Sequence, residues 1–223
     1  IGSGEQSGTW GDTTNTNLDL IADAFGFGTE APFDTDANKT TTVADGAADP
    51  ARAMYFKVTS TVSGGLTATR QLTIDPDTIN RLMFIENATT GGESITIKQG
   101  SGSGAAVTIP NGDTKAVILS GSGSGSIVLD AFASLNVVDL KVQDDIFLTS
   151  DSSAIKFGLG ADATLTHTND VGITLNGTNK LMFNDASQFV QGLSNTVLAL
   201  GATNEIDLTA TAIDINGTVD MSS

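Results

Sequence analysis

Short stretches in which apolar and polar residues alternate recur along most of this chain, and each is closed by Gly, Asn, Asp or Pro. Near the end, for example, Ile206 and Leu208 are followed, after a shift of one residue, by Ile213 and Ile215. Successive side chains of a strand point to opposite faces, so each stretch predicts a short strand with one apolar face. The chain is therefore expected to be all-β, and every strand face must find a cover.

Residues 54–132 contain the densest series of these stretches: MYFKVTS, LTATRQLTI, RLMFIEN, SITIKQ, AVTIP, KAVILS and SIVLDAF. Short strands with turn residues at this spacing predict an antiparallel β-sandwich or barrel-like domain. Two links inside it look alike, KQGSGSGAAV at 98–107 and LSGSGSGSIV at 119–128. They are interpreted as flexible hairpin tips or as a local duplication.

Residues 149–223 carry smaller units: AIKFG, ATLTH, VGITL, KLMFN, TVLAL, EIDLT, AIDING and TVDMS. The pairs Asn176-Gly177 and Asn216-Gly217 are favoured hairpin turns. Each unit is too small to bury its own face, so we expect a repetitive β shaft that stacks along one chain or between several. A transition segment at 133–148, extended or briefly helical, precedes it, and a polar connector at 29–53 precedes the sandwich-like domain.

The N-terminal segment, residues 1–28, holds the one clear helix pattern. Leu18, Ile21, Ala22 and Phe25 fall on one helical face. The helix is expected to start near residues 14–16 and to end at Gly26, with Trp10 just ahead of it. Such a helix either packs on its own domain or docks on a larger partner.

The composition points to association between chains. Hydrophobic residues make up 39% of the chain but aromatic residues only 5%, so the core of one chain is thin. A subunit interface supplies burial that a single chain lacks. The formal net charge of −16 argues against partnership with nucleic acid or with an anionic membrane surface.

No motif predicts catalysis, a cofactor or a metal site. There is no cysteine and only one histidine, His167, interpreted as a strand residue; the alternative places copies of it around an ion or anion on a symmetry axis. Asp34, Asp36 and Asn38 begin like a calcium loop, but Lys39 stands where that loop needs Gly. The candidate carboxylates for polysaccharide cleavage are Asp144 with Asp145, Asp151, and Asp162 with Asp170. No aromatic platform accompanies them, and the chain is expected not to be an enzyme.

Three stretches resemble the tail fibres of tailed bacteriophages, particularly those of marine phages. SGTWGDTTNTNLDLIADAFG (7–26) resembles the N-terminal segment of such fibres. IENATTGGESITIKQGSGSGAAVTIPNGDTKAVILSGSGSGSIVLDAF (85–132) resembles a β-domain that follows it. VQDDIFLTSDSSAIKFGLGADATLTHTNDVGITLNGTNKLMFND (142–185), with the ending Asp214 to Gly217, resembles a shaft repeat.

The resemblance implies a homotrimeric structural protein of the virion. Its N-terminal segment would dock on other tail proteins (an adaptor or nozzle), and its shaft would project toward a host surface receptor. On this interpretation Trp10, Leu18, Ile21 and Phe25 are the expected docking residues, and Ile206, Leu208, Ile213 and Ile215 the expected trimer axis. The alternatives are a secreted or surface β-solenoid adhesin of a bacterium, without a visible secretion signal, and a capsid decoration protein.

Overall fold

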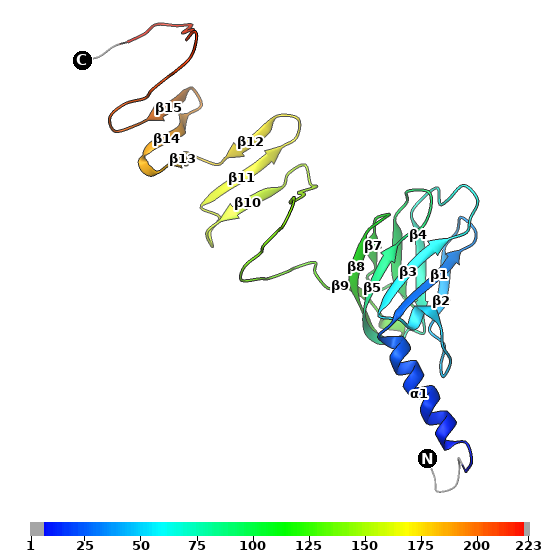
Figure 1. Cartoon of the computed structure of the whole chain (residues 1–223). Helices are drawn as coiled ribbons and strands as arrows, with labels where there is room; N and C mark the ends of the chain where they lie inside the picture. The colour runs from blue at the N-terminus through cyan, green and yellow to red at the C-terminus, as the bar shows by residue number, and fades with distance from the viewer. Residues whose placement is uncertain (1–6, 221–223) are drawn as a thin grey trace. The chain divides into compact units, whose positions relative to one another are not determined.

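The computed structural model describes residues 7–220, so the first six residues of the N-terminal segment and the last three of the predicted shaft lie outside the description. The chain divides into two compact units, Ile1–Val138 and Asp139–Ser223, called here the first and the second unit. Each is described by itself (Figure 1).

Helix α1, Trp10–Ala24, begins more than a turn earlier than the sequence predicts. The hydroxyl groups of Thr13 and Thr16 donate to the carbonyl oxygens of Thr9 and Asp12, four residues back, which accommodates these threonines inside the helix. Trp10 is thus the first helical residue rather than a residue ahead of the helix. The end is as predicted, because Gly26 N donates to Asp23 O directly after the last turn.

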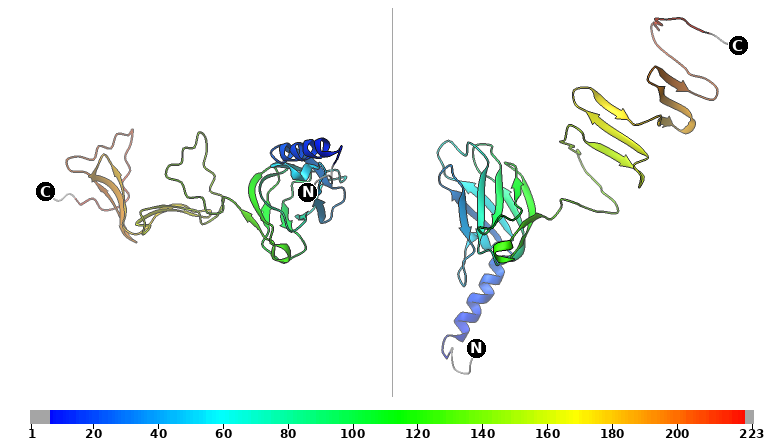
Figure 2. Two further views of the ribbon diagram at one scale, coloured as in Figure 1. Left: turned by 90° about the horizontal axis from the view of Figure 1, so that it is seen from below. Right: turned by 180° about the vertical axis from the view of Figure 1, so that it is seen from behind.

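The first unit contains two sheets that face each other (Figures 1 and 2). One sheet has the strand order β1-β3-β5-β8-β9 and the other β2-β4-β6-β7. The strands are β1 (Phe27–Phe33), β2 (Lys39–Thr42), β3 (Tyr55–Ser60), β4 (Arg70–Asp75), β5 (Asn80–Asn87), β6 (Ile95–Gln99), β7 (Val107–Ile109), β8 (Thr114–Ser120) and β9 (Val128–Asp130). Two single turns of 3-10 helix, Pro50–Arg52 and Gly123–Gly125, complete the unit.

Strand pairing in this unit differs from the predicted antiparallel pattern. The chain alternates between the sheets from β1 to β6, so β1, β3 and β5 pair in parallel, as do β2, β4 and β6. Parallel neighbours need a crossover connection, and here each crossover is a strand of the opposite sheet. Only β7, β8 and β9 add antiparallel pairs, and the described strands form no closed barrel.

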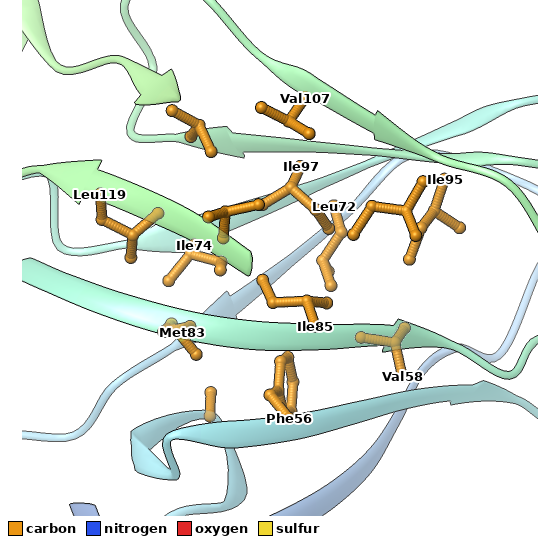
Figure 3. Close-up of a cluster of buried hydrophobic side chains, with 14 of the residues drawn as sticks. Phe56, Val58, Leu72, Ile74, Met83, Ile85, Ile95, Ile97, Val107 and Leu119 are labelled. Carbon is orange, nitrogen blue, oxygen red and sulfur yellow. The ribbon is translucent and has the colours of Figure 1, made fainter. Parts of the chain in front are cut away.

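One hydrophobic core lies between the two sheets (Figure 3). Alternate residues of every central strand point inward, which is the period-two pattern read from the sequence. Phe56, Met83 and Ile85 of one sheet lie opposite residues of the other in a cluster in which nearly all side chains are fully buried. The other sheet contributes Leu72, Ile74, Ile95, Ile97, Val107 and Ile109, and β8 of the first sheet contributes Val117 and Leu119.

The predicted connector at 29–53 is partly wrong, because it contributes β2 and most of β1 to the sheets. Gly28 aligns with the buried Phe56 of β3, and it leaves the space that Pro50 occupies. A Cβ atom added at Gly28 would lie 2.0 Å from Pro50 O, so only glycine fits there. The sheets of the first unit therefore start at Phe27 rather than at residue 54.

The two glycine-rich links pack against each other. Both join antiparallel strands, β6 with β7 and β8 with β9, as predicted for hairpin tips. A Cβ atom at Gly104 would meet Ser126 O at 1.9 Å, and one at Gly102 would meet Ser124 O at 2.5 Å. The fully buried side chain of Gln99 holds the base of the link, with Nε2 donating to Ile79 O at 2.6 Å and Oε1 accepting from Gly121 N at 3.1 Å.

The second unit contains two three-stranded antiparallel sheets, β10-β11-β12 and β13-β14-β15. Their strands are β10 (Ala154–Phe157), β11 (Ala163–Thr168), β12 (Gly172–Leu175), β13 (Lys180–Phe183), β14 (Asp185–Ser194) and β15 (Val197–Gly201). Residues 133–148 contain neither helix nor strand.

Three predictions for this region are corrected. Strand β14 is absent from the prediction, and the strands predicted after residue 204 do not form within the described residues. Asn176-Gly177 is not a hairpin turn, because β12 and β13 belong to different sheets. Asn176 instead accepts from Thr164 N at 2.6 Å and so closes the end of β11.

Substitutions at two neighbouring residues of β8 should differ in their effect on the free energy of unfolding. Leu119 is fully buried, whereas the neighbouring Ile118 is 37% exposed on the outer face. Leu119→Ala should lower the free energy of unfolding of the full chain by about 2–5 kcal/mol, since it leaves a cavity. Ile118→Ala should cost clearly less. Urea denaturation followed by circular dichroism measures both, and equal losses would contradict the described core.

Candidate functional site: interaction surfaces

The second unit has strands but no core of its own. None of residues 139–220, its described part, is buried, whereas the first unit buries a whole cluster of apolar side chains. Ordering a residue costs roughly 1–2 kcal/mol of backbone entropy, and burial of apolar surface normally offsets it. The surfaces of this unit are therefore the strongest candidates for contact with other chains.

The sheet β10-β11-β12 has one apolar and one polar face. Directly opposed residues of an antiparallel sheet share a face. Leu165 lies between Ile155 and Leu175, and His167 lies opposite Ile173. Phe157 and Ala163 extend the same face. The opposite face carries Ala154, Lys156, Thr164, Thr166, Thr168 and Thr174.

A hollow lies on the apolar face. Its walls are Ile155, Leu165, His167 and Ile173 of the sheet together with Ile146, Leu148 and Ser153 of the preceding segment. No charged side chain lines it. The segment covers the sheet incompletely, because Ile173 remains 68% exposed and Ile146 65% exposed. Below, the four sheet residues Ile155, Leu165, His167 and Ile173 are called the β10–β12 apolar face.

The sheet β13-β14-β15 is less sharply divided. Leu181, Val190 and Leu200 oppose one another in one row, and all of them are at least partly exposed. On the other face, Lys180 Nζ lies 3.7 Å from the centre of the Phe189 ring, diagonally across β13 and β14. The ammonium group thus covers one side of the ring in a cation–π contact.

The expected docking residues form one exposed stripe on α1. At about 100° per residue, Trp10, Leu18, Ile21 and Phe25 fall within one quarter of the helix circumference. Each is between 56% and 72% exposed, and no residue of α1 is buried. Of the two alternatives read from the sequence, packing of the helix on its own domain is not observed.

The acidic residues of α1 lie away from this stripe. Asp12, Asp19 and Asp23 are on the opposite side of the helix at the same angular spacing. The apolar stripe is therefore free of charge along its whole length. No part of the described structure shows which partner covers it.

Contacts at the end of α1 attach it to the sheets of the first unit. Arg81 Nη2 donates to Ala24 O at 3.4 Å and also to the backbone oxygen of Arg52. Burial and the neighbouring charge of Arg52 lower the pKa of Arg81. Arg52 itself lies beside Asp49, with Nε 3.7 Å from Oδ2. This cluster ties the helix end to the turn Pro50–Arg52.

The expected trimer-axis residues lie beyond the last strand. Ile206, Leu208, Ile213 and Ile215 are between 49% and 63% exposed and belong to no strand. Ile206 and Leu208 line a hollow together with Phe189, Val190 and Leu200. Nothing in one chain brings all of the predicted axis residues together.

The calcium-like residues make protein contacts instead. Asp36 accepts from Arg70 Nε at 2.7 Å and from Thr67 Oγ1 at 2.5 Å. Asn38 Oδ1 accepts from Gln71 N at 2.9 Å, and Asp34 pairs with Lys39. The segment DTDAN is thus a clasp that holds the β1–β2 loop against the start of β4.

Of the candidate carboxylates, Asp162 and Asp170 do not form a pair suited to glycoside cleavage. Asp162 precedes β11 and Asp170 follows it, so they lie at opposite ends of that strand. At ~3.3 Å per residue they are roughly 25 Å apart, whereas glycoside cleavage needs about 5–10 Å. Among residues 7–220, no three His, Asp or Glu side chains gather in a way that suits a metal ion.

Within the described part of the chain, no helix has both the length and the apolar character needed to cross a bilayer. No protein-family model, curated protein or solved structure matches the chain.

The clasp at Asp36 predicts a pH-dependent contribution to stability. The hydrogen bonds from Arg70 and Thr67 lower the pKa of Asp36 well below its ordinary value. A lowered carboxyl pKa in the folded state stabilises the protein above about pH 4, and this stabilisation declines as the pH falls further.

Asp36→Asn should therefore lower the unfolding midpoint in urea at pH 7, and its difference from the unaltered chain should narrow toward pH 3. Asp45→Asn, at an exposed aspartate of the same polar stretch, serves as the matched control and should change little. A difference for Asp36→Asn that stays constant across this range would contradict the ion pair.

Proposed function

We propose that the protein is a non-enzymatic structural subunit of a bacteriophage virion, a tail-fibre chain that acts as a homotrimer. The observation that carries the proposal is the second unit, which has ordered strands with apolar faces and not one buried residue among 139–220. Such faces require other chains along their whole length, as in an extended assembly. The resemblance of residues 7–26, 85–132 and 142–185 to fibre proteins supports the same conclusion.

The parts take distinct roles in this proposal. Helix α1 docks on another tail protein through Trp10, Leu18, Ile21 and Phe25, whose exposure agrees with such a contact. The two facing sheets of the first unit form a sandwich-like spacer that is stable by itself, because it has its own core. The second unit forms the trimeric shaft that projects toward the host surface.

The acidity of the chain suits this role. A net charge of −16 keeps the exterior soluble, and the exposed apolar stripe on α1 and the β10–β12 apolar face are free of carboxylates. Charge is therefore absent from the faces that need partners. Neither nucleic acid nor an anionic membrane is a proposed partner.

A second candidate, a β-solenoid adhesin of a bacterial surface, is favoured by one observation. The chain coils between two sheets from β1 to β6 with parallel neighbours, as solenoids do. The coiling stops at β7–β9, which pair antiparallel, and the second unit does not continue it. A capsid decoration protein would share the virion context and differ in the partner of α1.

The first test is the mass of the purified chain in solution by light scattering. We expect three times the 22.7 kDa of one chain. A folded monomer with a protected second unit would contradict the trimeric fibre and favour the adhesin.

A double substitution tests the docking stripe. Trp10→Ala with Leu18→Asp should leave the trimer folded, since neither side chain is buried, and should prevent incorporation into particles. Asp12→Ala with Asp19→Ala, on the acidic side of α1, is the matched control. Immunoblotting of purified particles measures incorporation, and normal incorporation of the first variant would refute the docking assignment.

A further inference from the structure

We infer that the β10–β12 apolar face is a contact surface between copies of this chain, and that the polar threonine face of the same sheet points away from the contact. The inference rests on the proposed assembly of several copies and deepens it by assigning the surface. It places the contact between copies on strands β10–β12, whereas the sequence predicts it at the distal residues around Ile206, which belong to no strand.

The sheet β10-β11-β12 separates its apolar residues from its polar residues on opposite faces. Leu165 and His167 of β11 lie on one face with Ile155 and Ile173, whereas Thr166 lies on the other. A single sheet is stable only when its apolar face is covered, and here the chain's own cover consists of Ile146 and Leu148. The face remains open, with Ile173 68% and Ile155 47% exposed.

The charge distribution of the chain favours a contact between copies at this face. The face is lined by no charged group, although the chain carries 26 acidic residues and only 10 basic ones. Two copies of so acidic a protein repel each other wherever carboxylates meet, so a self-contact requires a surface without them. A basic partner would instead need acidic residues on this face, and none line it.

The area of this face is small for an interface on its own. At a strand spacing of ~4.8 Å and a rise of ~3.4 Å per residue, a three-stranded sheet of this length presents roughly 250 Å². A stable interface buries more than about 1,000 Å². One such face is too small to hold an unrelated protein alone. A copy of the chain repeats the same faces in the same order, so several small contacts form together.

Cysteine cross-linking tests the inference, because the chain contains no cysteine of its own. Ile173→Cys places a thiol on the apolar face, and Thr174→Cys places one on the opposite face of the same strand. Both positions are exposed in the single chain. The full-length variants are treated with a short bis-maleimide reagent and run on a denaturing gel, and their masses before treatment are measured by light scattering.

We expect both variants to be oligomers, Ile173→Cys to give covalent dimers in high yield, and Thr174→Cys to give at least tenfold less. An oligomer that cross-links through Thr174→Cys, or through neither, would overturn the assignment of the face while leaving the proposed assembly intact. A monomeric unaltered chain would overturn both.

A charge-insertion pair provides an independent readout. Leu165→Asp should raise the chain concentration at which the oligomer half-dissociates by at least 100-fold and should speed hydrogen exchange in β10–β12. Thr166→Asp, with the same charge one residue along, should leave both unchanged. Equal effects of the two substitutions would count against the inference.

Discussion

An amphipathic β-sheet persists only when something covers its apolar face, and this requirement governs the whole chain. The first unit meets it internally, because the chain crosses from one sheet to the other at each step and so brings two apolar faces together. The second unit makes only three-stranded sheets from consecutive strands, and none of its described residues, 139–220, is buried. The same local pattern of alternating residues thus has two outcomes, which the long-range connection decides.

In the first unit, the polar groups stabilise the path of the chain. On the outer face of the β1–β9 sheet, Lys57 Nζ donates to Glu86 Oε1 at 2.8 Å between neighbouring parallel strands. Lys115 Nζ donates to Asp130 Oδ2 at 3.0 Å between β8 and β9. Exposed pairs of this kind contribute little free energy, at most about 1 kcal/mol each. They favour the observed register, and the apolar core supplies most of the stability.

The sequence predicts the individual strands of the first unit well. Each of the stretches between Met54 and Phe132 contains a strand, because its alternating residues are long enough to show which face is buried. Strand direction could not be read in this way, because the alternation of side chains is the same in parallel and antiparallel pairs. Strands β1 and β2 lie in the stretch predicted as a connector, since Gly28 and Pro32 interrupt the first and the second buries only Thr41.

The candidate surfaces were predictable in part. The stripe on α1 was readable from helical spacing, although the start of the helix was misplaced because Thr14, Asn15 and Thr16 resemble caps. The apolar residues of β10, β11 and β12 were visible singly, but their union on one face depends on register. That register pairs Leu165 with both Ile155 and Leu175, and a slip of one residue would mix the two faces.

Small faces placed in series can still make a stable assembly. Once one face of each copy is in contact, the remaining faces are held near their counterparts, so further contacts form at a high effective concentration. Strands joined by short turns, such as β10 to β12, need little loop-closure entropy to align. In the proposed assembly, folding of the second unit and association of the chains would be one cooperative step, and the first unit would rely on its own core. Such coupling would account for ordered strands without a buried side chain among residues 139–220 in a chain with 5% aromatic residues.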